Sequence, residues 1–275
     1  MPLSDFIRTL NSVPGHTPGF LERAGLDHPF VAADGRIFIH YANIRLESQF
    51  LPVVEASTGK LFGHAASIEA HGLSNNIPMS HDAIFVLPSD DEEFVYLDRL
   101  VRTLHALNYL TRPTRGNLML RVHARHVLSV PANHGLAFEE ILRPCGLFPE
   151  QITLEIDTDA VEDKAHFIRA IGNYRSRGYS IAIGQFGRSH LDFDFLKELQ
   201  PDIVKLSPAL ISHSNSLERI IEAIHRQGAK VMIDGINTAS LRRAASAENI
   251  DLLQAYAPLL GTRQADERWL YKNAA

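Results

Sequence analysis

Cysteine, long apolar runs and an excess of charge of either sign are what this 275-residue sequence has least of. Its single cysteine, Cys145, excludes an intrachain disulfide and is typical of proteins from the reducing cytosol. No run approaches the roughly 18 apolar residues of a membrane-spanning helix. Residues 1–6 (MPLSDF) lack the basic and apolar blocks of a signal peptide. We therefore expect a cytoplasmic protein without a membrane anchor.

The charge balance is mildly acidic, with 27 Lys and Arg against 32 Asp and Glu, a net charge of −5. Such a chain has no broad electrostatic attraction to nucleic acid or to anionic lipid, so no direct nucleic-acid partner is expected. Motifs of nucleophilic and nucleotide-hydrolysing enzymes are also lacking. There is no Gly-x-Ser-x-Gly, and residues 184–187 (GQFG) lack the Lys-Ser/Thr of a phosphate loop.

The first forty residues predict an irregular N-terminal arm or cap. Residues 13–15 (VPG) and 17–19 (TPG) are turn signals, because proline fixes φ and glycine permits chain reversals. We expect residues 1–40 to pack as a short extension on one main domain, residues 41–275. A length of about 250 residues is ordinary for a single α/β barrel.

A hairpin and a long helix are predicted after this arm. Residues 49–54 (QFLPVV) and 60–66 (KLFGHAA) are strand-like and flank a turn at residues 57–59 (STG). The helix is expected to begin near Ser89, where residues 89–92 (SDDE) form a capping box.

Strand-like and helical runs alternate through the rest of the chain. The strands are predicted at residues 118–123, 152–157, 180–183, 202–206, 230–234 and, with a weaker pattern, 251–254. The helical runs include residues 164–177 and 217–227, each followed by a glycine that favours helix termination. This alternation indicates parallel strands joined by crossover helices. Six such units and a hairpin predict a closed TIM-like (β/α)8 barrel.

Polar residues at the predicted strand ends are the least core-like feature of the sequence. In a barrel of this kind, function gathers at the C-terminal ends of the strands. Glu155 and Asp157 are two residues apart and so share a face, as do Arg121 and His123. The other residues at these ends are Gly184, Gln185, Lys205, Ser207, Asp234 and Gln254.

Five of these segments resemble the motifs of the EAL domain, the cyclic-di-GMP phosphodiesterase family. They are residues 154–158 (LEIDT), 181–187 (IAIGQFG), 201–207 (PDIVKLS), 231–238 (VMIDGINT) and 251–256 (DLLQAY). Their order and spacing are similar to the family's over roughly residues 46–262. The resemblance implies a barrel of the EAL type.

The same resemblance implies that the hydrolytic site is degenerate. Family members use two metal ions, which polarise the phosphate and activate water, and magnesium or manganese requires mainly carboxylate ligands. The resemblance places the signature Glu-Ala-Leu on Ala65, Ala66 and Ser67, the asparagine ligand on His123, and the paired aspartates on Gly184 and Gln185. The remnants are Glu155, Lys205, Asp234 and Gln254, with Asp234 in place of a longer glutamate. We therefore expect no catalytic residue, no metal and no cofactor, and Mg or Mn only if the family activity survives.

Recognition of the nucleotide also has weak support in the sequence. The family's glutamine before a proline falls on Leu51, and its arginine after Glu-Ala-Leu falls on Glu69. A glutamate near a dianionic ligand adds repulsion and removes a bidentate donor. The remaining ligand-binding candidates are Arg121, His123, Asp157, Gln185 and Lys205.

Three functions stay open on the sequence. The first is a catalytically inactive regulatory module of bacterial signalling that binds a protein partner or forms a homodimer, as the resemblance to silent EAL-like domains implies. The second is a non-hydrolysing cyclic-di-GMP receptor. The third is a phosphodiesterase with a metal site rebuilt from His123, Glu155 and Asp157. Against this last function, Arg121 and Lys205 are expected to neutralise the carboxylates of the mouth, because buried charges need partners.

Overall fold

Eight strands close into a barrel in the computed structural model, which describes residues 29–112, 116–159, 161–207, 210, 214–236 and 249–255. In order around the barrel they are β3 (Ile44–Glu55), β11 (Leu252–Ala255), β10 (Lys230–Ile236), β9 (Ile203–Leu206), β8 (Ser180–Phe186), β7 (Ile152–Asp157), β6 (Asn117–Val122) and β4 (Leu61–Gly72), which pairs again with β3. Neighbouring strands are parallel except that β3 is antiparallel to both β4 and β11. The predicted TIM-like barrel is confirmed, and the predicted hairpin supplies two of its strands.

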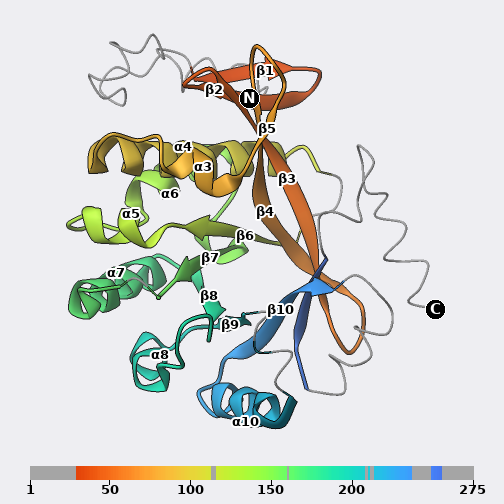
Figure 1. The fold of residues 1–275 in the computed structure, drawn as a ribbon, viewed down its shortest axis with the longest axis vertical. Helices are drawn as coiled ribbons and strands as arrows, with labels where there is room; N and C mark the ends of the chain where they lie inside the picture. The colour runs from red at the N-terminus through yellow and green to blue at the C-terminus, as the bar shows by residue number, and fades with distance from the viewer. Residues whose placement is uncertain are drawn as a thin grey trace.

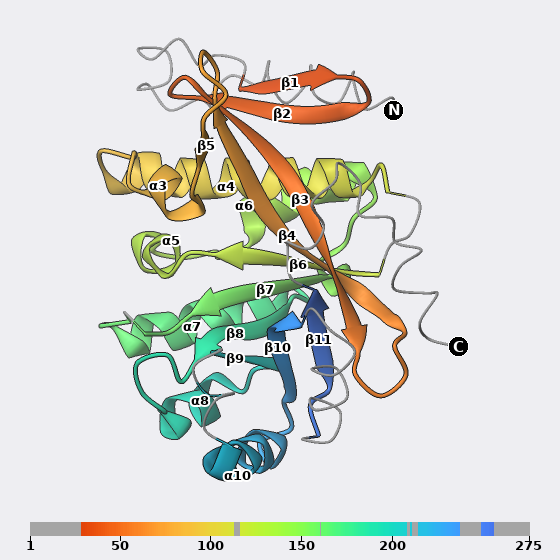
Figure 2. The same ribbon diagram turned by 45° about the vertical axis from the view of Figure 1, so that its right-hand side comes forward.

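Helices cover the outside of the parallel strands (Figures 1 and 2). They are α5 (Ala124–Ser129), α6 (Leu136–Leu142), α7 (Lys164–Ser176), α8 (Phe193–Leu199) and α10 (Ser214–His225), with short 3-10 turns η1 (Arg143–Cys145) and η2 (Pro149–Gln151). The largest apolar cluster lies between these helices and the outward faces of the strands. A smaller cluster, including Val53, Met119 and Met232, fills the barrel interior. None of the helices in the described ranges is long and apolar enough to cross a membrane.

The same sheet continues beyond one side of the barrel. Strands β3 and β4 are each 12 residues long, and their far halves continue beyond the barrel as an antiparallel sheet. This sheet also contains β1 (Phe30–Ala33), β2 (Arg36–Tyr41) and the short β5 (Pro78–Met79). It packs on α3 (His81–Phe85) and α4 (Asp91–Tyr109) through its own apolar cluster. We call this extension of the sheet the outer lobe, and Figure 2 shows it above the barrel.

Two local predictions need correction. The N-cap of α4 is Asp90, one residue later than predicted: its carboxylate accepts a hydrogen bond from the Glu93 backbone N–H, and Glu93 in turn accepts one from the backbone N–H of Ser89. Residues 30–41 are not irregular but form β1 and β2, and the predicted boundary at residue 40 falls inside β2. Residues 1–28 and Tyr256 onward lie outside the described residues.

The mouth of the barrel as candidate functional site

Strand register brings most of the predicted site residues together at the C-terminal mouth of the barrel. Arg121 on β6 lies beside Glu155 on β7, and Asp157 lies beside Gly184 on β8. On the other side of β8, Lys205 of β9 lies beside Met232 of β10, which places Asp234 two residues further toward the mouth. The mouth is therefore lined by charged groups from β6, β7, β9 and β10, while β8 between them contributes no charged side chain.

Lys205 is the centre of this charged lining. Its Nζ lies 3.1 Å from Glu155 Oε1 and 3.1 Å from Asp234 Oδ2, and the lysine side chain is only 7% exposed. The contact with Glu155 passes across β8, which is possible because β8 presents Ala182 and Gly184 on this face, beside Glu155 and Asp157 respectively. Burial lowers the pKa of Lys205, but the attraction of both carboxylates outweighs burial and raises it above its usual value. The lysine is therefore held as a cation.

Two arginine side chains pair with Asp157. An Arg121 Nη atom donates a hydrogen bond of 2.8 Å to Asp157 Oδ2, and Arg188, in the loop after β8, places an Nη atom 3.7 Å from the same oxygen. Arg188 is also bonded through Nε to Asp159 at 2.7 Å. Both arginine side chains are nearly half exposed, so these pairs form the outer rim of the mouth.

Gly184 has no room for a side chain. A Cβ atom at this position would lie 2.4 Å from Asp157 Oδ1 and 3.2 Å from Glu155 Oε1. The next residue, Gln185, has a left-handed backbone with φ of 48° and lies where the pairing of β8 with β9 changes register. This irregularity is typical of a β-bulge, which redirects side chains at a strand end.

His123 does not join the carboxylates. Its ring packs edge-on against Phe94 at 4.9 Å and stacks on Phe85 at 6.2 Å, between the centroids. Its Nδ1 accepts a hydrogen bond of 3.1 Å from the backbone N–H of Arg125, so the imidazole caps helix α5. Burial lowers the pKa of His123, which favours the neutral ring. No hydrogen bond or ion pair links this side chain to Glu155 or Asp157 within the described residues.

The family model for the EAL domain matches residues 38–257. The chain belongs to the EAL domain family. The YkuI protein of Bacillus subtilis, solved with an EAL domain in complex with substrate c-di-GMP and calcium, shares the fold with a TM-score of 0.67 at 18% identity over 82% of this chain and 60% of that one. A standalone EAL protein from Vibrio cholerae O395, in its c-di-GMP bound form, gives 0.65 at 19% identity over 78% and 92%.

One curated relative is similar over a shorter stretch. It is described as "Probable cyclic di-GMP phosphodiesterase PdeB" of Escherichia coli strain K12, and it is 28% identical over 94 residues. That stretch is 33% of this chain and 18% of the relative, so the match spans under a fifth of that protein's length.

The positions on which the resemblance places the family's motif residues lie on β3, β4 and β8 of the EAL domain. Leu51 and Ala65 are paired neighbours on β3 and β4, and both are buried. Ser67 lies two residues further along β4 on the same face as Ala65, and Ala66 lies on the opposite face. Glu69 is exposed in the outer lobe, opposite Glu47.

The donor set at the mouth does not fit two divalent cations. Within the described ranges, no three His, Cys, Asp or Glu side chains are placed to hold one metal ion. Glu155 and Asp234 are both engaged by one ammonium group, and Asp157 by guanidinium groups. Divalent magnesium or manganese requires several free oxygen ligands around one point. No step of a reaction is therefore assigned to a metal in this domain.

Gln254, one of the predicted remnants, has a buried polar atom whose hydrogen bonding is unsatisfied. It lies on β11, it is 8% exposed, and its Oε1 is buried without a hydrogen-bond partner among the described residues. Asp157 Oδ1 is in the same condition. Arg188 and Asp159 are the mouth residues that sequence reasoning missed, because both lie in loops that no strand or helix pattern positions.

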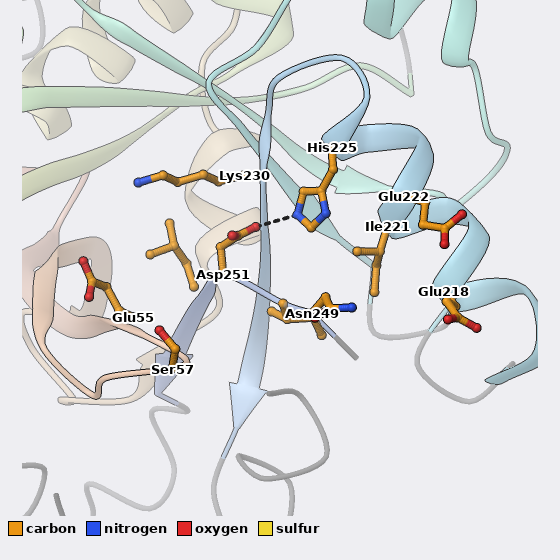
Figure 3. A pocket seen from close by; sticks show the side chains of 11 residues that line it. Glu55, Ser57, Glu218, Ile221, Glu222, His225, Lys230, Asn249 and Asp251 are labelled. Carbon is orange, nitrogen blue, oxygen red and sulfur yellow. Dashed lines mark hydrogen bonds and ion pairs between the residues drawn. The ribbon is translucent and has the colours of Figure 1, made fainter. Parts of the chain in front are cut away.

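A separate cavity of about 560 Å³ lies at the opposite end of the barrel, beside the starts of β10 and β11 (Figure 3). Within it, His225 Nε2 lies 2.9 Å from Asp251 Oδ2, and the same oxygen accepts a 2.7 Å hydrogen bond from the Val231 backbone N–H. This pair joins the end of α10 to the two strand starts. No predicted site residue lines this cavity, and no sequence pattern indicated it.

Proposed function

We propose that this EAL domain does not hydrolyse cyclic-di-GMP and acts by binding a protein partner. The observation that carries the proposal is that the chain's own cations engage the carboxylates of the mouth. Glu155 and Asp234 share the ammonium of Lys205, and Asp157 is bound to Arg121. A two-metal mechanism needs these oxygens free to hold cations that polarise the phosphate. The positions of Ala65 and Gly184 add no further carboxylate.

Exposed apolar side chains support the protein-partner half of the proposal. Four of the six large hydrophobic side chains that are exposed within the described residues fall between residues 73 and 87, namely Leu73, Ile77, Val86 and Leu87. Val86 is 78% exposed and Ile77 is 58% exposed. A concentration of exposed apolar side chains in one segment is typical of interaction surfaces. The segment connects β4 to α4 and contains β5 and α3.

The catalytic half is tested by incubating purified protein with cyclic-di-GMP in Mg²⁺ or Mn²⁺ and measuring linear product. We expect no product above the protein-free control. The binding half is tested by affinity capture from the native host with wild-type protein and with Val86→Glu and Ile77→Glu variants. A specific partner is expected to be captured by the wild type and by Arg121→Ala, and lost with both glutamate variants. Turnover of the nucleotide, or a partner retained by both glutamate variants and lost with Arg121→Ala, would contradict the proposal.

A non-hydrolysing cyclic-di-GMP receptor is the second candidate. Two observations favour it: the Arg121 side chain is 41% exposed at the mouth, and the buried Oε1 of Gln254 has no hydrogen-bond donor in the part of the chain that the structure describes. Structural relatives have been solved with c-di-GMP bound. Calorimetric titration with cyclic-di-GMP, with and without Mg²⁺ or Ca²⁺, separates the two candidates. Binding that Arg121→Ala abolishes would favour the receptor, and the absence of any heat of binding would exclude it.

A further inference from the structure

Residues 61–98, from the start of β4 into α4, contain no lysine and no arginine. Seven carboxylates fall in this stretch, namely Glu69, Asp82, Asp90, Asp91, Glu92, Glu93 and Asp98. The stretch also holds four of the six large hydrophobic side chains that are exposed within the described residues. Acidic and exposed apolar side chains are therefore concentrated in the same part of the chain, without basic residues between them.

The fold itself accounts for four of these carboxylates. Asp90 caps α4 by accepting a hydrogen bond from the backbone N–H of Glu93, whose own side chain accepts one from Ser89. Asp91 pairs with Arg125 of α5 at 2.7 Å. Asp98 is buried and ion-paired. These four side chains stabilise the start of α4 and its contact with α5, so they need no external partner.

Asp82 on α3 and Glu92 in the first turn of α4 have no such role. The Asp82 side chain is 94% exposed, and Glu92 is also exposed. His81 Nδ1 lies 3.4 Å from Asp82 Oδ1, but burial and the charge of Arg121 lower the pKa of this histidine, which favours the neutral ring. Within the described ranges, no lysine or arginine pairs with Asp82 or Glu92. Both carboxylates are therefore available to a cation from outside the chain.

Val86 and Leu87 lie between these two carboxylates, in the connection from α3 to α4. Val86 is 78% exposed and Leu87 is 41% exposed, although Ile84 and Pro88 on either side of them are buried. The buried neighbours hold the connection against the domain and leave two adjacent apolar side chains in solvent. Adjacent exposed apolar side chains rimmed by polar groups are typical of a binding surface.

We propose that the α3–α4 surface, formed by Asp82, Val86, Leu87 and Glu92, docks a basic amphipathic segment of a partner protein. The inference rests on the proposed function and names the chemistry of the partner that it requires. Apolar side chains of the segment cover Val86 and Leu87, while its lysines or arginines pair with the two carboxylates. Charge complementarity of this kind also excludes acidic segments, because like charges repel across an interface.

The test uses a fluorescent peptide of about 18 residues, built from leucine and lysine with the leucines on one helical face. Fluorescence anisotropy measures its Kd for the full chain. We expect Leu87→Ser to raise the Kd about fivefold or more, since it removes an apolar contact. Asp82→Asn/Glu92→Gln keeps the shape of both side chains and removes their charges, and it should raise the Kd about fivefold. A matched peptide with glutamate in place of lysine should not bind.

Two control variants match these changes at other places on the surface. Leu191→Ser truncates a leucine that is 40% exposed, close to the exposure of Leu87, and Glu198→Gln removes an exposed carboxylate of α8. Both should bind the leucine–lysine peptide as the wild type does. Amide hydrogen exchange gives an independent readout, because the bound peptide should slow exchange in residues 81–93 of the wild type.

Four outcomes would overturn the inference. They are no binding of the leucine–lysine peptide, an equal Kd for wild type, Leu87→Ser and the charge variant, binding of the glutamate peptide as tight as that of the lysine peptide, and self-association of the wild type that Leu87→Ser abolishes. The last, measured by sedimentation velocity, would assign the surface to a second copy of this chain. Failure of the proposed function is distinguishable, since it would appear as nucleotide turnover by the wild-type protein.

Discussion

Asp157 and Gly184 determine together what the mouth of this EAL domain can hold. The two residues are paired neighbours on β7 and β8, and the carboxylate of one occupies the space in which a side chain of the other would lie. Asp157 cannot easily turn away, since Arg121 and Arg188 hold its second oxygen. Placing an aspartate at position 184 therefore faces both a steric and an electrostatic barrier.

We expect Gly184→Asp to destabilise the protein and not to restore hydrolysis. A Cβ atom 2.4 Å from Asp157 Oδ1 is a severe overlap, and overpacking of this kind costs about 1–3 kcal/mol. Repulsion between the new carboxylate, Asp157 and Glu155 adds to it. Urea unfolding measures the loss, and an assay for linear cyclic-di-GMP product measures activity.

Gly184→Ala is the matched control, because it adds the Cβ without the charge. It should retain the steric part of the destabilisation, and Asp157→Ala in the same chain should relieve it. A Gly184→Asp protein as stable as the wild type would mean that Asp157 moves freely, which contradicts the packing described for the mouth.

At the scale of elements, one side chain of α4 fixes the outer lobe to the rest of the domain. Asn108 is buried, its Oδ1 accepts a hydrogen bond of 2.9 Å from the Ile37 backbone N–H, and its Nδ2 donates one of 2.8 Å to the Ile37 carbonyl oxygen. The amide thus satisfies both backbone groups of a residue in β2. Apolar contacts of α4 with the same sheet complete the attachment.

Asn108→Leu should loosen β2 selectively. The substitution leaves a buried N–H and a buried carbonyl without partners, at a cost of about 1–3 kcal/mol for each group. We expect faster amide hydrogen exchange in β1 and β2, while β7 and β8 of the barrel keep their protection. Asn108→Asp keeps the acceptor for the Ile37 N–H but sets a buried carboxylate oxygen against the Ile37 carbonyl oxygen, so it should loosen β2 as well. Equal acceleration in lobe and barrel would show that the two do not open separately.

The sequence predicted the elements whose signals are local. The strands β6 to β10 are short apolar runs separated by helices, and alternation of this kind indicates parallel pairing. Strands β1 and β2 are the exception, since their signal is also local but was not used. β1 pairs with β2 across Asp34 and Gly35, and β2 pairs with β3 across Ala42 and Asn43, two-residue turns with positive φ at both residues. The cap of α4 was displaced by one residue because Ser89, Asp90 and Asp91 all suit a helix start.

Only those residues of the candidate site that lie on strands could be predicted from the sequence, because the alternation of strands and helices brings the strand ends together. Lys205, Glu155 and Asp157 are inward residues of strands, and the sequence placed them at one mouth. His123 lies one residue beyond β6, so its side chain follows the cap of α5 instead of the strand. Arg188 joins the rim through the geometry of a loop, which no periodicity in the sequence encodes.

At the scale of the whole molecule, buried histidines couple stability to pH. Burial, with a further contribution from His81, lowers the pKa of His105 to about 3, and its Nδ1 lies 2.8 Å from the Ser48 hydroxyl. Burial also lowers the pKa of His126 to about 3, although the nearby Asp98 opposes this. Both rings therefore stay neutral in the folded protein at pH values where the unfolded chain, with a histidine pKa of about 6.5, binds protons.

Acidification should therefore lower the free energy of unfolding already at pH values above those at which carboxylates titrate. Because the unfolded state binds more protons than the folded state between about pH 6.5 and pH 3, the free energy of unfolding falls as the pH is lowered through this window. For His105 alone, the loss between pH 7 and pH 5 is about 2 kcal/mol. Urea unfolding midpoints of wild type and His105→Gln at the two pH values test this. The variant should lose less stability on acidification by about that amount, whereas His190→Gln, at an exposed position, should behave as the wild type. Identical acid sensitivity in His105→Gln and wild type would mean that His105 is protonated in the folded protein, and that the contact of α4 with β3 accommodates a charge.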